Sequence, residues 1–262
     1  MSGSLIQNYK DFEISLNEVT PLYKDEGHEI FWLGINDETA FRCNAYLIHD
    51  GDEYILVDPG SRSFYEQVRE RVAQITNPDN VNAIIVCHQD PDVAASMIDW
   101  LDANPEITII SSARTNVLLP HYGKEDYTFY DIVEDGDYTF KSGRKLQFIE
   151  APFLHFPGAF TTYDVTSSML FSGDIWAALD IDWKLLVDDF EEHQMNMDLF
   201  HVDYMASNIA ARGYVRRLDG IDIQTILPQH GSIIPQEYVA DALQYLETLQ
   251  CGLDIVYSDL KR

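Results

Sequence analysis

At the centre of this chain stands Ala83-Ile84-Ile85-Val86-Cys87-His88-Gln89-Asp90-Pro91-Asp92-Val93, an apolar run that ends in a polar cluster. The apolar part is typical of a buried strand. His88, Asp90 and Asp92 are potential metal ligands at alternate positions, and an extended backbone would point them to the same side. Pro91 disfavours a helical conformation at Asp90. The cluster therefore predicts a metal site, with an acidic surface turn as the alternative.

Three further apolar stretches end in a ligand-type residue beside glycine or proline. They contribute His155, Asp174 and His230. Active sites of layered α/β proteins commonly lie at strand ends. One strand-end histidine alone is more often a core or capping residue than a ligand. Four segments of this kind in one chain indicate a shared site.

The charge of the chain limits its partners. The 262 residues include 44 acidic and 17 basic side chains, which gives a formal net charge of −27. Nucleic acid and anionic lipid would both be repelled. No apolar run approaches the roughly 18 residues of a membrane-spanning helix, and the N-terminus does not resemble a signal peptide. We expect a cytoplasmic protein that binds neither nucleic acid nor a membrane.

The cysteines Cys43, Cys87 and Cys251 are scattered and form no C-x-x-C pair. This spacing argues against a disulfide framework and against a zinc or iron–sulfur site built from cysteines. Cys87 precedes His88, but neighbours on a strand face opposite ways. We therefore expect Cys87 to be a small, buried apolar residue.

Strand-like and helix-like stretches alternate along the chain. Strands are predicted at 44–48, 54–57, 83–87, 107–110, 146–149, 168–172 and 225–227, with a hairpin turn at 50–52 and short strands within 122–140. Helical segments are predicted at 63–75, 94–101, 113–119, 183–217 and 239–249. Strands mixed with helices predict an α/β layered fold, which we interpret as one domain over residues 1–262.

With these motifs the chain resembles the metallo-β-lactamase superfamily, and within it the flavodiiron proteins. Superfamily hydrolases carry H-x-H-x-D-H where this chain has His88-x-Asp90-x-Asp92-Val93, and flavodiiron proteins carry H-x-E-x-D-H. The carboxylate of Asp90 at the second position of the motif is thus similar to the glutamate that the flavodiiron proteins, the iron-binding branch, have there. Residues 155–157, 170–174, 228–231 and 44–48 resemble its H-W-P, L-F-S-x-D, P-S-H-G and N-S-Y-L-I segments. The resemblance implies an αββα sandwich over nearly the whole chain.

Carried over residue by residue, the resemblance implies two non-haem iron ions. The implied ligands are His88, Asp90, His155 and Asp174 for the first iron and Asp92, Asp174 and His230 for the second, with Asp174 bridging. Val93 stands where the family has a further histidine, so the second iron lacks one protein ligand. The carboxylate of Asp90 makes the site harder, which favours iron, although zinc accepts the same donors.

Other residues have expected roles near this site. Asp58 ends a strand and is expected to support the architecture of the site. Tyr163 and Trp176 are candidates for the pocket wall, with core packing as the alternative. The histidines outside the motifs are expected to be surface or structural residues: His28, His49, His121, His193 and His201.

Stand-alone chains of this pattern resemble the oxygen-binding diiron proteins, which serve bacterial chemotaxis as oxygen sensors. Flavodiiron proteins continue into a flavodoxin-like domain that binds FMN, but this chain stops at Arg262, so we expect no FMN. The resemblance implies a protein that binds dioxygen and signals to chemotaxis proteins; it also implies a homodimer. Two alternatives stay open: an oxygen or nitric-oxide reductase fed by a separate redox partner, and a metal-dependent hydrolase.

Overall fold

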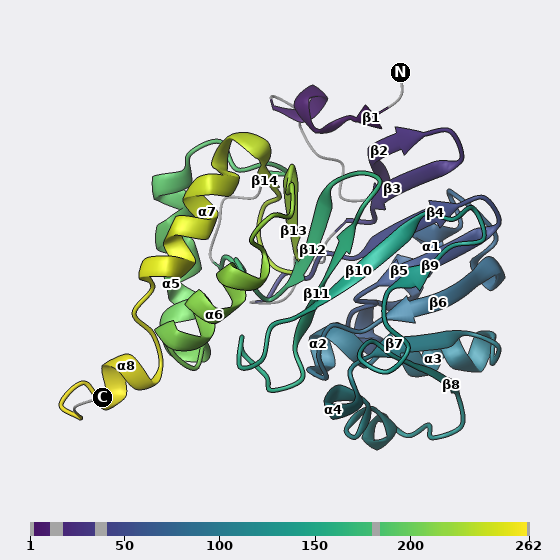
Figure 1. The fold of residues 1–262 in the computed structure, drawn as a ribbon. Helices are drawn as coiled ribbons and strands as arrows, with labels where there is room; N and C mark the ends of the chain where they lie inside the picture. The colour runs from purple at the N-terminus through teal and green to yellow at the C-terminus, as the bar shows by residue number, and fades with distance from the viewer. Residues whose placement is uncertain (1–2, 11–17, 35–40, 180–183, 261–262) are drawn as a thin grey trace.

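Two β-sheets pack face to face, with helices on both outer faces (Figure 1). The computed structural model describes residues 3–10, 18–34, 41–179 and 184–260. The layer order is therefore helix, sheet, sheet, helix, which is the αββα arrangement that the resemblance implied. The N-terminal half of the chain builds the first sheet, and the C-terminal half builds the second.

The first sheet has the strand order β1-β2-β3-β4-β5-β6-β7-β8. Its strands are β1 (Gly3–Ser4), β2 (Thr20–Asp25), β3 (His28–Trp32), β4 (Tyr46–Asp50), β5 (Glu53–Val57), β6 (Val81–Ile85), β7 (Thr108–Ser111) and β8 (Thr128–Asp131). The first five strands pair antiparallel, and β5 to β8 pair parallel. The predicted hairpin is confirmed as β4 and β5, joined by a turn in which Gly51 has φ 63°.

The second sheet has the strand order β14-β13-β12-β11-β10-β9. Its strands are β9 (Tyr138–Thr139), β10 (Lys145–Glu150), β11 (Phe160–Asp164), β12 (Met169–Gly173), β13 (Thr225–Pro228) and β14 (Ile234–Pro235). Only β12 and β13 pair parallel among these described strands, and the long connection between them carries two helices.

The helices divide between the two outer faces of the sandwich (Figure 1). Beside the first sheet lie α1 (Tyr65–Val72), α2 (Pro91–Ala94), α3 (Met97–Ala103) and α4 (Ala113–Asn116). Beside the second lie α5 (Phe190–Tyr204), α6 (Asn208–Arg217) and α7 (Gln236–Thr248), followed by α8 (Leu253–Val256). Short 3₁₀ helices are η1 (Ile6–Tyr9), η2 (Arg62–Phe64), η3 (Pro78–Asn80) and η4 (Leu119–Tyr122).

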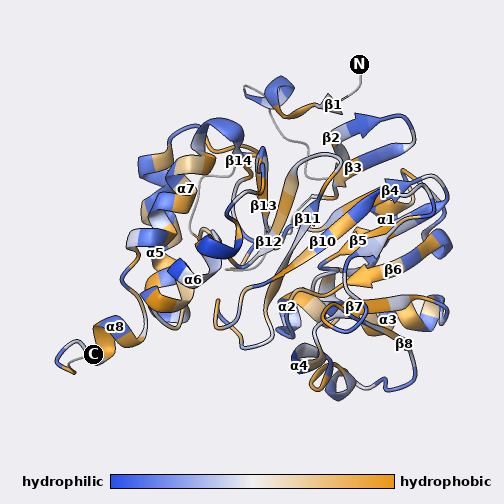
Figure 2. Cartoon of the chain, viewed as in Figure 1, coloured by the Kyte–Doolittle hydropathy of each residue, from blue (hydrophilic) through white to orange (hydrophobic). Residues whose placement is uncertain are grey.

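Three apolar clusters hold the layers together. One lies between the sheets and includes Trp32 and Phe171. A second lies under α5 to α7 and includes Phe200 and Leu246, and a third lies under α1 to α4 and includes Trp100. Figure 2 shows the apolar residues concentrated on the strands between these layers. Burial of apolar area on both faces of each sheet is the main stabilising contribution to this architecture.

The structure also corrects several expectations from the sequence. The hairpin of β2 and β3 was not predicted, nor was β11. The expected helical stretch at 183–217 begins only at Phe190, where the Asp189 carboxylate caps α5 by accepting bonds from the N–H groups of Glu191 and Glu192, at 3.0 and 3.1 Å. Across the described residues, none of the helices combines the length and apolar character needed to cross a membrane.

Candidate metal centre

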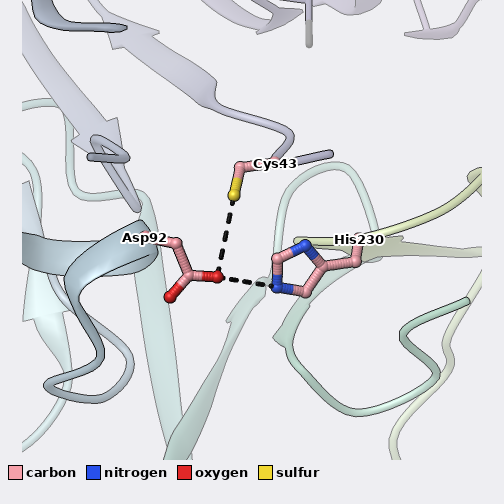
Figure 3. Close-up of side chains that lie close together, drawn as sticks. All are labelled: Cys43, Asp92 and His230. Atoms are coloured by element: carbon pink, nitrogen blue, oxygen red, sulfur yellow. Dashed lines mark hydrogen bonds and ion pairs between the residues drawn. The ribbon is translucent and has the colours of Figure 1, made fainter. Parts of the chain in front are cut away.

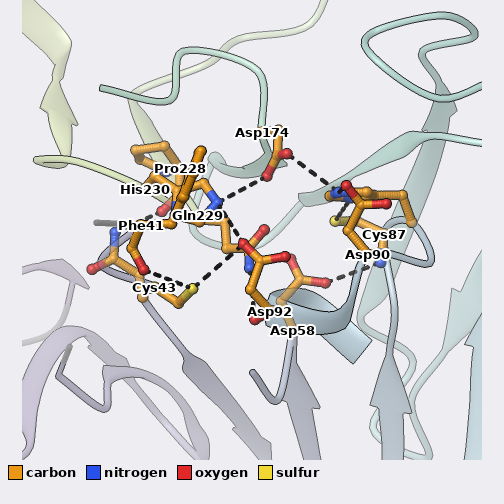
Figure 4. Close-up of polar contacts among 12 residues, drawn as sticks. Phe41, Cys43, Asp58, Cys87, Asp90, Asp92, Asp174, Pro228, Gln229 and His230 are labelled. Atoms are coloured by element: carbon orange, nitrogen blue, oxygen red, sulfur yellow. Dashed lines mark hydrogen bonds and ion pairs between the residues drawn. The ribbon is translucent and has the colours of Figure 1, made fainter. Parts of the chain in front are cut away.

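The six predicted ligands meet where strand ends of the two sheets converge. Figure 4 shows four of them, Asp90, Asp92, Asp174 and His230. His88 follows β6 of the first sheet, while Asp174 and His230 follow β12 and β13 of the second. Gly173 has φ 56°, and a Cβ placed there would lie 2.7 Å from the sulfur of Cys87. Glycine at this position therefore lets the two strand ends approach each other, and it brings Asp174 against His88.

The backbone after His88 does not stay extended, so the condition under which 88, 90 and 92 would point to the same side is not met. Asp90 is extended, with ψ 147°, as Pro91 requires. Pro91 is then the first residue of α2, and it places Asp92 in the first helical turn. The turn separates the two carboxylates, and each of them joins a different group of ligands.

The first ligand group contains His88, Asp90 and His155, whose ligand atoms all lie within 4.8 Å of one another. The Nε2 atom of His155 lies 3.4 Å from Asp90 Oδ2 and 3.1 Å from Asp174 Oδ2. The Nε2 atom of His88 lies 3.2 Å from the same Asp174 oxygen. Two imidazoles and two carboxylates thus converge on one point.

The second ligand group contains Asp92 and His230, together with Cys43 (Figure 3). The Nε2 atom of His230 lies 3.4 Å from Asp92 Oδ2 and 3.4 Å from Asp174 Oδ1. The two oxygens of Asp174 therefore face different groups, Oδ2 toward the first and Oδ1 toward the second. A carboxylate in this position can bridge two metal ions.

Unsatisfied polar atoms test whether the site fits a metal. Within the described part of the chain, Asp174 Oδ1 and His88 Nε2 are buried and make no hydrogen bond, and each has only ion-pair contacts, the nearest at 3.4 and 3.2 Å. Buried polar atoms are normally hydrogen-bonded, and a missing ion is one reason for an exception. Nitrogen and oxygen donors of this mixture suit iron and zinc alike. The residues present therefore fit a pair of transition-metal ions.

The charges at the site depend on one another. Burial alone would raise the pKa of Asp174, but His88, His155 and His230 hold it well below its ordinary value. Burial would likewise lower the pKa of His155, but hydrogen bonds to Asp174 and Asp90 raise it to about 10. The metal-free site thus holds protonated imidazoles beside carboxylates. A metal ion must displace those protons in order to bind.

A cavity of about 380 Å³ opens onto both ligand groups. Aromatic side chains form its wall: Phe200 and Tyr204 of α5 lie over His155, with ring centroids 5.8 and 5.9 Å from the imidazole. Phe41 lies 5.5 Å from the His230 ring. The site can therefore admit a small molecule while apolar surface limits its contact with water.

Three comparisons with known proteins are in agreement. A family model described as "ODP family beta lactamase" matches residues 41–231. The chain belongs to this family. A solved structure described as the peroxy diiron species of the chemotaxis sensor ODP is 33% identical, with a TM-score of 0.82, over 92% of this chain and 100% of that one. The apo state of the chemotaxis sensor ODP from T. denticola is 32% identical, with a TM-score of 0.80, over 93% of this chain and 99% of that one.

Curated relatives of this ODP-family chain are longer. The nitric oxide reductase of Moorella thermoacetica is 29% identical over 72% of this chain and 49% of its own length. The putative diflavin flavoprotein A 1 of Nostoc sp. is 24% identical over 77% of this chain and 34% of its own length. The chain thus spans between a third and a half of these two proteins. The predicted resemblance and the predicted fold class are both confirmed.

Supporting residues around the ODP-family site come from the adjoining strands. Asp58 accepts a hydrogen bond of 3.0 Å from the backbone N–H of Cys87, so it ties the end of β5 to the end of β6. Burial raises the pKa of Asp58 to about 6, although this bond opposes the shift. Cys87 is buried, as predicted, but its sulfur lies 3.1 Å from Nδ1 of His88. The expectation that the two side chains face opposite ways is therefore wrong.

Two of the pocket candidates pack in the core instead. The hydroxyl of Tyr163 donates to the carbonyl of Asp222, at 2.9 Å, and the indole of Trp176 donates to the carbonyl of Ala242, at 2.8 Å. Neither side chain lines the cavity, so the alternative of core packing holds for both. Val93 is also fully buried, in the apolar cluster under the first sheet.

His201 has a structural role. Its Nε2 accepts from the backbone N–H of Trp176 at 2.9 Å, and its Nδ1 donates to the carbonyl of Met197 at 2.9 Å. These bonds fix the loop after Asp174 against α5. His28 and His49 are also paired within the fold, with carboxylates. The expectation of structural histidines is confirmed for these three residues.

Sequence reasoning missed Cys43, Phe41, Phe200 and Tyr204, which all line the cavity. Phe200 and Tyr204 are four residues apart on α5, a spacing that places both on one helix face. That spacing could have been noticed, but it does not reveal what the face covers. No signal in the sequence places Cys43 beside His230, since 187 positions along the chain separate them and only the fold brings them together.

Proposed function

We propose that this ODP-family chain holds two iron ions, binds dioxygen at them, and reports the bound state to chemotaxis proteins in the cytoplasm. The observation that carries the proposal is the position of Asp174, whose two oxygens face two groups of ligands at 3.1–3.4 Å. The likeness to the chemotaxis sensor ODP, over 92% of this chain, supports the sensor role.

Each part of the site has a task in this proposal. His88, Asp90 and His155 would hold the first iron, Asp92 and His230 the second, and Asp174 would bridge them. Two ferrous ions would supply one electron each to dioxygen. Three carboxylates offset the positive charge of the ions, and the imidazoles release protons as they are loaded.

The wall of the cavity supports binding without rapid turnover. Phe200 and Tyr204 pack against His155 with their rings nearly perpendicular to the imidazole, and their apolar surface limits the access of water to the ligand groups. Reduction of dioxygen to water needs two electrons beyond those of a ferrous pair, together with protons. The aromatic side chains narrow the access of water and so slow the delivery of protons, so we expect bound oxygen to persist.

A reductase is the second candidate, because the nitric oxide reductase of Moorella thermoacetica is 29% identical over 72% of this chain. It would need a separate electron donor. A zinc or manganese hydrolase is the third candidate, acting through metal-bound hydroxide. The absence of FMN, the homodimer and the single domain over 1–262 stay predictions of the sequence.

The deciding experiment is anaerobic reconstitution with ferrous iron, followed by exposure to oxygen and then by its removal. We expect two irons per chain and a visible absorption band that appears with oxygen and then stays or reverses. Oxygen consumption is measured in parallel with a generic electron donor. Rapid multi-turnover consumption would instead identify a reductase, and a chain that retains zinc and shows no band would favour the hydrolase.

A further inference from the structure

Cys43 lies where a further ligand of the second group would be expected. Its sulfur lies 3.8 Å from Asp92 Oδ2, to which the thiol donates, and its ligand atom is within 4.8 Å of those of Asp92 and His230. Figure 3 shows the three side chains pointing toward one another from three separate segments. Cys43 also lines the cavity, and it is only partly exposed.

The backbone holds Cys43 in this place. Residue 43 forms an isolated antiparallel bridge with His230, and the N–H of Asn44 donates to the carbonyl of Gln229 at 2.6 Å. The Nδ1 atom of His230 donates to the carbonyl of Arg42 at 3.3 Å, which leaves Nε2 as the atom free to bind a metal. The thiol and the imidazole are therefore fixed together, next to Asp174.

Without Cys43, the two ligand groups differ in how many nitrogen or sulfur ligands they offer. The first has two imidazoles, and the second has only His230, because Val93 lies in the apolar core and cannot ligate. The buried Asp174 Oδ1 faces the second group, where it lies 3.4 Å from its ion-pair partner His230 Nε2 and makes no hydrogen bond among the described residues. A buried carboxylate oxygen without a hydrogen bond is a second observation that points to a cation at this position.

We propose that Cys43 binds the second metal ion through its sulfur, so that this position has one imidazole, two carboxylates and one thiolate. The inference rests on the proposed two-metal site. The thiol passes its proton to solvent as the sulfur–metal bond forms, and no redox change is involved. Thiolate is a softer donor than imidazole, so the second position should be softer than the first and should favour iron or zinc over manganese.

The test uses cobalt(II) as a spectroscopic probe in the full chain. We expect two equivalents to bind and a sulfur-to-cobalt absorption band to appear in the near ultraviolet. Cys43→Ser should lose the band and bind the second equivalent about 10-fold or more weakly, since even substitutions outside the metal ligands cost about 10–100-fold. Cys43→His should restore two tight equivalents without the band. Cys251→Ala, at a buried cysteine away from the site, should still bind two equivalents of cobalt and still show the band.

A second measurement needs no variant. Burial raises the pKa of the Cys43 thiol, so the reaction is run at alkaline pH. In metal-free protein Cys43 should then react with an alkylating reagent through the cavity, and cobalt should slow this reaction about 10-fold or more, as read by peptide mass spectrometry. Two tight equivalents with no sulfur band and unchanged alkylation would overturn the Cys43 proposal while leaving the two-metal site standing. Fewer than two equivalents in the wild type would overturn the two-metal site and, with it, this inference.

Discussion

At the scale of single residues, Asp174 is the side chain on which both ligand groups depend. Its side chain is 5% exposed, and the Nε2 atoms of three histidines lie 3.1–3.4 Å from its oxygens. A buried carboxylate is costly unless opposite charge surrounds it. Protonated imidazoles supply that charge in the metal-free protein, and metal ions would supply it once the protons leave.

Asp174→Asn tests this dependence, because asparagine keeps the size of the side chain but removes its charge. We expect both metal positions to weaken, by at least about 10–100-fold, since the amide offers one acceptor oxygen instead of two. Equilibrium dialysis with elemental analysis measures the change. Asp188→Asn is the control, because this carboxylate is 56% exposed and pairs with Lys184 on the surface. Two tight equivalents in Asp174→Asn would contradict the bridging role.

At the scale of elements, α5 covers the site with one face. Phe200 and Tyr204 stack on each other, with ring centroids 4.7 Å apart and an interplanar angle of 11°, and both rings lie over His155. Phe200 is 2% exposed, whereas Tyr204 is 49% exposed. The buried ring therefore anchors the helix to the core, while the half-exposed ring borders the mouth of the cavity.

Phe200→Ala should both destabilise the protein and open the cavity. Removal of a buried phenylalanine ring costs about 3–5 kcal/mol of the free energy of unfolding. Water should then enter the cavity, so the absorption band formed with oxygen should decay faster than in the wild type. Leu199→Ala is the matched control on the same helix, because Leu199 is 53% exposed, and its effect should stay within about 0.5 kcal/mol.

Urea unfolding measures the free energy of unfolding of each variant, and stopped-flow absorption measures how fast the band formed with oxygen decays. Tyr204→Ala should cost less stability than Phe200→Ala, since its ring is already half exposed. An unchanged decay rate in a folded Phe200→Ala protein would show that the aromatic wall does not protect the bound oxygen.

At the scale of the whole molecule, a buried ion pair network joins the two sheets. His28 of β3 bonds through Nδ1 to Asp50 of β4, at 2.9 Å, and through Nε2 to Asp164 of β11, at 3.0 Å. The three side chains are almost fully buried. Burial would lower the pKa of His28, but the hydrogen bonds and charges of Asp164 and Asp50 raise it. The protonated imidazole thus links one sheet to the other.

The raised pKa sets the pH dependence of this contribution. A histidine whose folded pKa lies above its unfolded value of about 6.5 stabilises the fold fully below that pH. The stabilisation is lost as the pH rises through the folded pKa. Urea unfolding over a pH series should therefore show this loss on the alkaline side of about 6.5 in the wild type.

His28→Gln should remove this pH-dependent contribution and lower the free energy of unfolding by about 3–5 kcal/mol at neutral pH. His121→Gln serves as the control. Equal pH dependence in wild type and His28→Gln would contradict the linkage.

Much of the site could be predicted because strand ends carry local signals. The apolar run before His88 and the glycine before Asp174 mark where two strands end, and those marks do not depend on the rest of the fold. The direction of Asp92 could not be predicted. The direction depends on where α2 starts. Proline can be the first residue of a helix, as Pro91 is here, but it also disfavours a helical conformation at the residue before it. Its presence alone therefore does not show whether a helix begins there.

The sequence alone determined the alternation of strands and helices over most of the chain, the six candidate ligands and the acidic character, because these follow from local composition and spacing. It did not determine the hairpin of β2 and β3 or strand β11. Only the tertiary structure decided that Asp174 faces two groups of ligands, that Phe200 and Tyr204 cover them, and that Cys43 joins the second group. These are contacts between residues far apart in the chain. They are set by how two sheets and a helix pack, and no local pattern encodes that packing.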